Sequence, residues 1–215
     1  MTPILHNFFR SSASIRVRAA LNLKGISYDQ VSYVLRENEH HSEAFLALNP
    51  QGLVPALQLD SQTVIAQSLA IIDYLEEVYP EPAFLPKTPL DRAWVRSLAY
   101  SLACDVHPIN NLRVLGYIGT ELGADDAQVK AWFQHWVAEA FGPLETMLAK
   151  DARRGRFCYG DTPGYADLSL FAQVTNNRRF EVNMAPYPTI QAIYQACMAV
   201  PAFVDALPDN HPHAS

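Results

Sequence analysis

Four prolines between residues 80 and 89 divide this sequence into two parts with different hydrophobic patterns. Proline fixes its own backbone angle and lacks the backbone N–H, so this segment should end the preceding helix and stiffen a linker. Strand and helix patterns alternate before it, and helix patterns dominate after it. We therefore predict two domains over residues 1–82 and 90–207, a linker over 83–89 and a mobile tail over 208–215.

The part before the prolines alternates short strand and helix patterns. Strands are expected over residues 3–8, 26–35, 54–59 and 63–66, and helices over 14–24, 42–48 and from 68 onward. Gly25 follows the first of these helices, in the position where a left-handed residue commonly ends a helix. The order βαβαββα predicts an α/β domain with a mixed sheet.

The part after the prolines should be all helical. Thr88 offers a hydroxyl cap, Pro89 suits the first helical position and Asp91 the third, so a long helix should begin here. Another long helix should begin at Asp125 or Asp126. Its expected buried face comprises Val129, Phe133, Trp136, Ala140 and Leu144. Shorter helices are expected over 165–174 and 189–200.

Composition limits the classes of protein to consider. The 215 residues are 49% hydrophobic and carry a formal charge of -6, which favours buried cores and argues against a nucleic-acid-binding surface. The sequence has no apolar run of about 18 residues, as a membrane span would need, and its N-terminus lacks a signal-peptide pattern. We expect a cytoplasmic protein that binds neither membrane nor nucleic acid.

Cysteines, histidines and the densest basic cluster give no independent functional signal. The three cysteines suggest neither a disulfide framework nor a metal site, and the histidines lack zinc spacing, so we expect no metal. The basic cluster of Arg153, Arg154 and Arg156 is interpreted as a solvated turn.

The stretch SSASIRVRAALNLKG at residues 11–25 poses the first functional question. It begins a helix after a strand, and a helix start favours anions because its first N–H groups lack partners and its dipole is positive there. Serine before a helix is also a common N-cap, but one serine would suffice for that role. With Arg10 and Arg16 nearby, both interpretations stay open.

Two other places have a similar character. Gln67 and Ser68 come directly after a strand and before a large helix, so Ser68 is either a cap or part of a carboxylate site. Val54 precedes Pro55 at a strand start. If the peptide bond between them is cis, the Val54 backbone could pair with an extended peptide.

Five motifs in family order resemble the zeta class of glutathione transferases, which includes maleylacetoacetate and maleylpyruvate isomerases. They are SSASIRVRAALNLKG, ALNPQGLVPAL, IAQSLAIIDYLEE, GDTPGYADLSL and NNRRFEVNMAPYPTI, and the resemblance spans nearly the whole chain. It implies the glutathione transferase fold: an α/β N-terminal thioredoxin-like domain followed by an all-α C-terminal domain. It also implies glutathione as cofactor and a homodimer.

The resemblance implies roles for individual residues. Ser11 would donate a hydrogen bond to the glutathione thiolate, which lowers the thiol pKa, with Arg10 and Ser12 as further catalytic candidates. Ser14 would then be the plain helix cap. The helix start at Ser68 would hold the γ-glutamyl carboxylate, and Val54 would pair with the cysteinyl backbone. The implied glutathione contacts are Ser11, Ser12, Ala13, Ser14, Ile15, Arg16, His40, Val54, Pro55, Gln67, Ser68, His107 and Asn111.

Arginines would bind the second substrate, a maleyl diacid. Arginine clasps a carboxylate through two parallel hydrogen bonds, and Arg10, Arg113 and Arg179 are the candidates. We expect thiolate addition to the conjugated double bond, rotation about the resulting single bond, and thiolate loss to give the trans product. Maleylacetoacetate, giving fumarylacetoacetate in tyrosine and phenylalanine catabolism, is preferred to maleylpyruvate of the gentisate pathway.

Three positions depart from the family pattern. Ala13 replaces a common cysteine, Ile15 a common tryptophan or histidine, and Gly164 a hydroxyl helix cap three residues before Asp167. The alternatives are general glutathione conjugation with haloacid dechlorination, and a non-catalytic glutathione-fold binding module. A scaffold needs no cations around its serine site, so the arginines favour the isomerase. The SSAS stretch lacks the thiols of a disulfide oxidoreductase.

Overall fold

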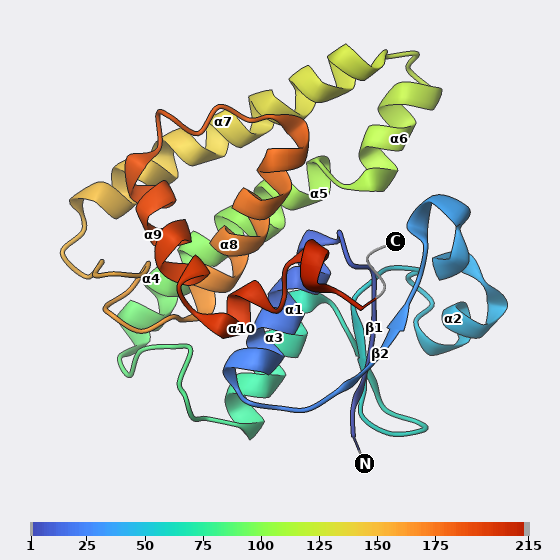
Figure 1. Ribbon diagram of the computed structural model, residues 1–215, viewed down its shortest axis with the longest axis horizontal. Helices are drawn as coiled ribbons and strands as arrows, with labels where there is room; N and C mark the ends of the chain where they lie inside the picture. The colour runs from blue at the N-terminus through green and yellow to red at the C-terminus, as the bar shows by residue number, and fades with distance from the viewer. Residues whose placement is uncertain (1, 213–215) are drawn as a thin grey trace. The chain divides into compact units, whose positions relative to one another are not determined.

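A computed structural model describes residues 2–212 and divides them at Phe84 (Figure 1). One unit comprises the chain up to Phe84 together with the segment from Val200, and the other runs from Leu85 to Ala199. No helix within residues 2–212 combines the length and apolar character needed to cross a membrane.

The first unit is built in the order βαβαββα, as predicted. Its elements are β1 (Ile4–Asn7), α1 (Ser12–Leu23), β2 (Asp29–Ser32), α2 (Glu43–Leu48), β3 (Ala56–Gln58), β4 (Val64–Ala66) and α3 (Ser68–Val78). Two 3₁₀ turns, η1 (Leu35–Glu37) and η2 (Glu39–His41), connect β2 to α2. The sheet order is β2-β1-β3-β4, with β1 and β2 parallel and the other pairs antiparallel, so the sheet is mixed.

The alternation of side chains along β1 explains how helices cover the sheet. Leu5 is fully buried, and the next residue, His6, points to the opposite face because successive strand residues alternate. On that face the His6 ring lies 6.0 Å from the ring of Phe45 in α2. Figure 1 shows α1 and α3 on one side of β1 and β2, and α2 on the other.

The C-terminal segment packs on the first unit, which corrects two predictions. Residues 200–207 were expected in the helical domain and residues 208–215 in a mobile tail. Instead, α10 (Pro201–Val204) and η5 (Pro208–Asn210) belong with the sheet, and His211 is buried with its Nε2 3.2 Å from Asn7 Oδ1. The segment is held because Asn22 and Arg18 donate hydrogen bonds to its carbonyls. Residues 213–215 lie outside the described part of the chain.

The second unit is helical, as predicted. Its elements are α4 (Pro89–Tyr100), the π-helical segment η3 (Ser101–Val106), α5 (His107–Ile109), α6 (Leu112–Thr120), α7 (Asp126–Lys150), α8 (Tyr165–Asn177), η4 (Arg178–Phe180) and α9 (Pro188–Met198). The predicted cap of α4 is present, with Thr88 Oγ1 accepting from the Asp91 amide over 3.1 Å. Asp125 and Gln128 form a capping box at the start of α7. Both caps use residues within one turn of the helix start, so the sequence alone predicts them.

The buried face of α7 is displaced from the predicted one. Phe133 and Leu144 are buried as expected, but Val129, Trp136 and Ala140 are only half-buried. The remaining buried positions of the helix are Val137, Phe141 and Leu148. Trp136 and Ala140 instead line a cavity of about 380 Å³ between α4, η3 and α7. Both the predicted and the observed set of residues fit the helical period, and packing decides that the observed set is buried.

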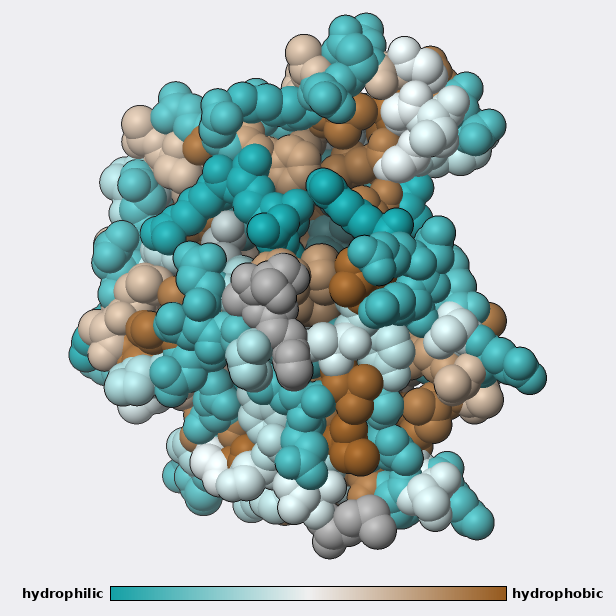
Figure 2. All heavy atoms as spheres, turned by 45° about the vertical axis from the view of Figure 1, so that its right-hand side comes forward, coloured by the Kyte–Doolittle hydropathy of each residue, from teal (hydrophilic) through white to brown (hydrophobic). Residues whose placement is uncertain are grey.

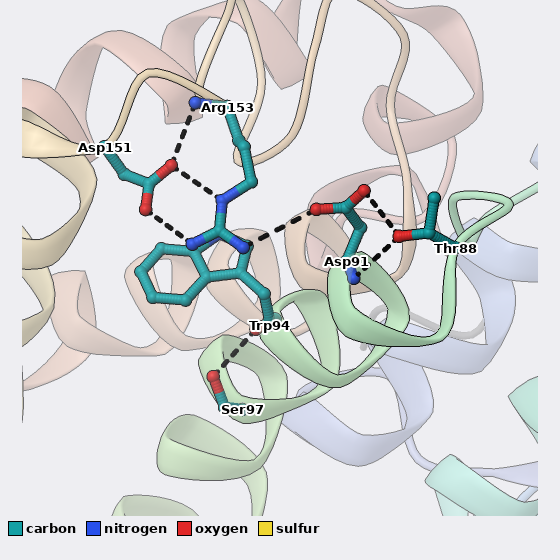
Figure 3. A network of polar contacts seen from close by, with 6 residues as sticks. All are labelled: Thr88, Asp91, Trp94, Ser97, Asp151 and Arg153. Carbon is teal, nitrogen blue, oxygen red and sulfur yellow. Dashed lines mark hydrogen bonds and ion pairs between the residues drawn. The ribbon is translucent and has the colours of Figure 1, made fainter.

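The basic cluster is more ordered than a solvated turn (Figure 3). Arg153 donates from Nε and Nη2 to the two carboxylate oxygens of Asp151 over 2.8 and 2.6 Å, and its Cζ lies 4.1 Å from the ring centroid of Trp94. Its Nη1 is 3.5 Å from Asp91 Oδ1. Arg154 donates to a carbonyl of α7 over 2.9 Å. The turn is thus partly exposed, and these two arginines also bind partners on α4 and around the end of α7.

Large hydrophobic side chains that stay exposed are spread along the chain, and Leu90 and Leu122 are the most exposed of them. On the face drawn in Figure 2, hydrophilic side chains cover most of the area and the hydrophobic patches are smaller. Scattered exposed apolar residues are normal for a folded chain and carry no functional argument by themselves.

Candidate active site

The start of α1 is capped by Ser11. Its Oγ accepts a hydrogen bond from the Ser14 amide over 3.3 Å, and its carbonyl accepts from the Ile15 amide over 2.8 Å. Ser14 lies inside the helix, where its Oγ accepts from the Phe8 amide over 3.4 Å. The prediction that Ser14 is the cap is therefore wrong, because the helix begins three residues earlier than the cap at Ser14 would place it.

The capped helix start presents hydrogen-bond donors suited to an anion. Ser11 Oγ accepts from a backbone amide, which leaves its own proton able to donate and polarises the hydroxyl. The amides of Ser12 and Ala13 make no hydrogen bond within the described residues. Ser12 is almost fully buried, and its Oγ has no hydrogen-bond partner there.

The start of α3 has the same character. Gln67 precedes it with a φ of 71°, a left-handed conformation that is strained for a residue with a side chain and is found at ligand sites. The first intrahelical bond runs from the Ile71 amide to the Gln67 carbonyl over 3.0 Å, so the three preceding amides point out of the helix. Gln67 Nε2 donates to Gln51 Oε1 over 2.7 Å. A carboxylate is a suitable ligand for such a helix start.

The two helix starts are joined by a buried arginine. Arg16 lies on α1 with almost no exposed surface, and its Nη1 donates to Ser68 Oγ over 3.3 Å. Ile15 is also buried, and its amide is bonded to the Ser11 carbonyl. Val54 precedes β3 in the same unit, and its bond to Pro55 is cis.

His40 lies in η2 of the same unit. Its ring is 4.0 Å from the ring of His41, and burial, followed by the neighbouring His41, lowers the pKa of His40. Its Nδ1 is buried and has no hydrogen-bond partner within residues 2–212. The imidazole is therefore neutral near pH 7 and able to accept or donate one hydrogen bond.

The remaining predicted residues are distributed between the two units. Arg10 is exposed in the turn before α1, with its Cζ 4.9 Å from the ring centroid of Phe9. In the helical unit, His107 begins α5, and Asn111 caps α6 by accepting from the Arg113 amide over 3.1 Å. Arg113 is exposed on α6, and Arg179 is exposed in η4.

One stretch of α7 holds both arginine-bearing segments of the helical unit. Trp132 Nε1 donates to the Ile109 carbonyl over 3.1 Å, next to the turn that leads to Arg113. Gln134 Nε2 donates to the Phe180 carbonyl over 2.8 Å, directly after Arg179. The segments are thus fixed to the same two turns of α7.

Sequence reasoning assigned no role to Gln51, Arg18 or Gln134, although each contacts a candidate segment. A polar residue within a buried helical pattern is the signal that could have drawn attention to Arg18. Gln51 and Gln134 have no comparable signal, because their partners are distant in sequence.

Metal chemistry has no ligand set within residues 2–212: no group of three or more His, Cys, Asp or Glu side chains there could hold an ion. Cys158 and Cys197 are buried, and burial raises the pKa of both thiols. Both thiols therefore stay protonated and unreactive near pH 7.

Comparison with known proteins decides the family. Residues 10–78 match the glutathione S-transferase N-terminal domain and residues 115–205 match the C-terminal domain. The chain is 48% identical to maleylpyruvate isomerase of a Ralstonia species, over 98% of this chain and 99% of the relative. The chain belongs to the glutathione transferases. It is also 42% identical to maleylacetoacetate isomerase of Pseudomonas aeruginosa, over 97% of each chain.

Solved structures place this glutathione transferase in the zeta class. A holo structure of maleyl pyruvate isomerase, described as a bacterial zeta-class glutathione transferase, matches with a TM-score of 0.95 at 47% identity and covers 99% of this chain and 100% of its own. Maleylacetoacetate isomerase from Methylobacterium extorquens, with bound malonate and glutathione, matches with a TM-score of 0.94 at 38% identity, over 99% of each chain.

Proposed function

We propose that this zeta-class protein is a glutathione-dependent cis–trans isomerase of maleyl diacids. The observation that carries the proposal is the helix start at Ser11, whose hydroxyl and neighbouring free amides form a donor site for a thiolate. Full-length relatives named maleylpyruvate and maleylacetoacetate isomerase support it.

The residues of the first unit fit glutathione. Three outward amides at the start of α3 suit the γ-glutamyl carboxylate. Val54 lies two residues before Ala56, the first paired residue of β3, where an extended peptide backbone could pair. Ser11 and the amides of Ser12 and Ala13 suit the sulfur. Two solved relatives contain glutathione, which supports this assignment.

Ser11 is proposed to stabilise negative charge on sulfur. Glutathione, when bound, supplies a thiolate that can add to the double bond of the maleyl group and leave again. The Ser11 hydroxyl donates to the sulfur while its oxygen accepts from the Ser14 amide. The positive end of the α1 dipole acts in the same direction. Together these groups lower the thiol pKa and raise the thiolate fraction near neutral pH.

Arg10, Arg113 and Arg179 are proposed to bind the carboxylates of the diacid. All three are exposed, so their guanidinium groups are accessible to an incoming anion. A guanidinium also offsets the charge that develops on the carbonyl-bearing part of the substrate. One solved relative holds dicarboxyethyl glutathione and citrate in its active site, which supports binding of multiply charged acids near the cofactor.

Maleylacetoacetate and maleylpyruvate are both candidate substrates. Maleylacetoacetate is the substrate expected from the sequence, whereas the identity of 48% with a maleylpyruvate isomerase, against 42% with a maleylacetoacetate isomerase, favours maleylpyruvate. We further propose a homodimer, which light scattering would detect as twice the 24.0 kDa chain mass, and a cytoplasmic location.

The test is turnover of both substrates by the wild type and by Ser11→Ala, with and without glutathione. We expect isomerisation only with glutathione, and a kcat for Ser11→Ala lower by about 100-fold with a smaller change in glutathione Kd. Because Ser11 also caps α1, Thr88→Ala is the matched control: it removes the cap of α4 and should leave kcat unchanged. No turnover of either substrate, or turnover without glutathione, would refute the proposal.

A further inference from the structure

Arg18 is a buried cation whose five N–H groups all have acceptors. The residue is 1% exposed. Its Nη2 donates to the Phe9 carbonyl and the Ala206 carbonyl, each over 2.8 Å. Its Nη1 donates to Asn7 Oδ1 over 2.8 Å and to the Phe8 carbonyl over 3.5 Å, and its Nε donates to Ala206 over 3.2 Å. The guanidinium therefore joins two separate pieces of backbone, the Phe8–Phe9 turn and the C-terminal segment at Ala206, and also binds the side chain of Asn7.

Two of these acceptors belong to the turn that delivers Ser11 to the start of α1. The Phe8 carbonyl also accepts from the Ser11 amide over 3.0 Å, which closes the turn. Phe9 lies two residues before Ser11. The other main acceptor, Ala206, belongs to the C-terminal segment, 188 residues away in sequence from Arg18. Arg18 thus braces the turn against the folded C-terminal segment.

The charge of Arg18 is held without a carboxylate partner among the described residues. Burial lowers the pKa of Arg18 to about 10, so the guanidinium stays charged at neutral pH. Its acceptors are carbonyls and the Asn7 amide, and a charged donor makes stronger hydrogen bonds to them than a neutral one. Only the planar fork of arginine reaches both pieces of backbone and the Asn7 side chain, because the lysine ammonium is a single point of charge.

We propose that Arg18 is a positioning residue for Ser11, and that the C-terminal segment, through the Ala206 carbonyl, is part of the same brace. The proposal rests on the proposed role of Ser11 in stabilising the glutathione thiolate. The fork holds the turn so that the Ser11 hydroxyl and the first α1 amides converge on one point. Without it, the turn relaxes and the thiolate loses donors.

The experiment compares wild type with Arg18→Lys and Arg18→Met. The thiol pKa of bound glutathione is titrated by the ultraviolet absorbance of the thiolate, and kcat and KM are measured alongside. We expect both variants to raise the bound thiol pKa by about one unit, which lowers the thiolate fraction and kcat about tenfold near neutral pH. The KM for glutathione should change less than kcat. The amide of Ser11 should also exchange its hydrogen faster.

Asn22→Ala is the matched control. Asn22 is on the same helix and donates to the Ala202 carbonyl of the C-terminal segment over 3.0 Å, and within residues 2–212 it makes no side-chain hydrogen bond to the turn before Ser11. It should leave the thiol pKa unchanged even if Tm falls. Should the Arg18 variants fail to fold, Asn7→Ala removes one acceptor and keeps the guanidinium, and it should raise the thiol pKa in the same direction.

Several results would overturn the proposal. A normal thiol pKa in Arg18→Lys would show that charge alone suffices, and a normal value in Arg18→Met or Asn7→Ala with a lower Tm would leave Arg18 a purely structural role. An effect of Asn22→Ala equal to that of Arg18→Lys would also count against it. Ser11→Ala separates failure of the proposed function from failure of the Arg18 proposal. If this variant leaves the thiol pKa unchanged, Ser11 does not stabilise the thiolate, whatever the Arg18 variants show.

Discussion

Arg16 donates a hydrogen bond from Nη1 to the hydroxyl of Ser68 over 3.3 Å, which ties the first turn of α3 to the second turn of α1. Both residues are buried, so the contact is shielded from water. The two helix starts that offer donors to the thiolate and to the carboxylate of glutathione are therefore fixed relative to each other within one unit. The distance between the two binding points is set before the ligand arrives, which reduces the ordering cost of binding.

Ser68→Ala should weaken glutathione binding. The substitution removes a hydroxyl at the start of α3 and takes away the acceptor of Arg16, so we expect the glutathione Kd to rise by about tenfold, as for loss of a hydrogen bond to a charged group. Isothermal titration calorimetry measures it. Ser61→Ala, in the exposed turn between β3 and β4, is the control and should leave Kd unchanged. An equal Kd for wild type and Ser68→Ala would contradict the prediction.

Asp167→Asn should destabilise the helical unit. The Asp167 carboxylate is buried and accepts from the Cys158 amide over 2.9 Å and from the Gly164 amide over 2.8 Å. Asparagine keeps one acceptor and turns an N–H group toward the other amide, so unfolding free energy should fall by about 2–3 kcal/mol. Urea unfolding measures the change. Asp126→Asn, at the exposed start of α7, should lower the unfolding free energy much less. Similar losses of unfolding free energy in both variants would contradict the stabilising role of the Asp167 hydrogen bonds.

The same carboxyl predicts a pH dependence. Burial raises the pKa of Asp167 to about 6 in the folded state, above the value of about 3.9 in an unfolded chain. The folded state therefore holds this proton more tightly, and the stability it contributes is present below about pH 4 and lost as pH rises through about 6. The difference in unfolding free energy between wild type and Asp167→Asn should shrink over this range. A difference that grows with pH would have the wrong sign.

Arg153→Lys should lower Tm slightly near neutral pH. Lysine cannot make the two parallel bonds to Asp151 or lie flat on the Trp94 ring (Figure 3). Hydrogen bonds from Arg153 lower the pKa of Asp151 to about 2, so the stabilisation is present above about pH 4 and lost as pH falls through about 2. Thermal melts from neutral to acid pH check both parts. Arg36→Lys, an exposed arginine of the other unit, is the control.

Gln134→Leu should raise the KM for the diacid by about threefold to tenfold and leave glutathione Kd unchanged. Gln134 donates to the Phe180 and Glu181 carbonyls over 2.8 and 3.2 Å, and thereby holds the turn that carries Arg179. Lys130→Met is the control, because it breaks only an exposed ion pair with Glu181. Steady-state kinetics measure the KM of each variant. If Arg179→Ala raises KM and Gln134→Leu does not, the Gln134 hydrogen bonds are not needed to position Arg179, which contradicts the prediction.

Local signals predicted much of the first unit and many helix starts. Thr88 and Asp125 cap their helices because a cap depends on residues within one turn of each other. Gly25 has a φ of 66° directly after α1, as its place in the sequence predicted. The cap at Ser14 was wrong because four neighbouring residues include three serines, and the strand that precedes them determines which one begins the helix.

The sequence by itself determined the family, the order of elements and the serine-rich helix start, because these depend on residue type and spacing along the chain. Only the tertiary structure decided that the C-terminal segment packs beside β1, and that Arg18 reaches Ala206 across 188 residues. It also decided which α7 stripe is buried and what Arg153 contacts. Each of these outcomes depends on residues that are distant in sequence. Close packing of the interior and the need of every buried donor for an acceptor decide which of these residues a side chain contacts.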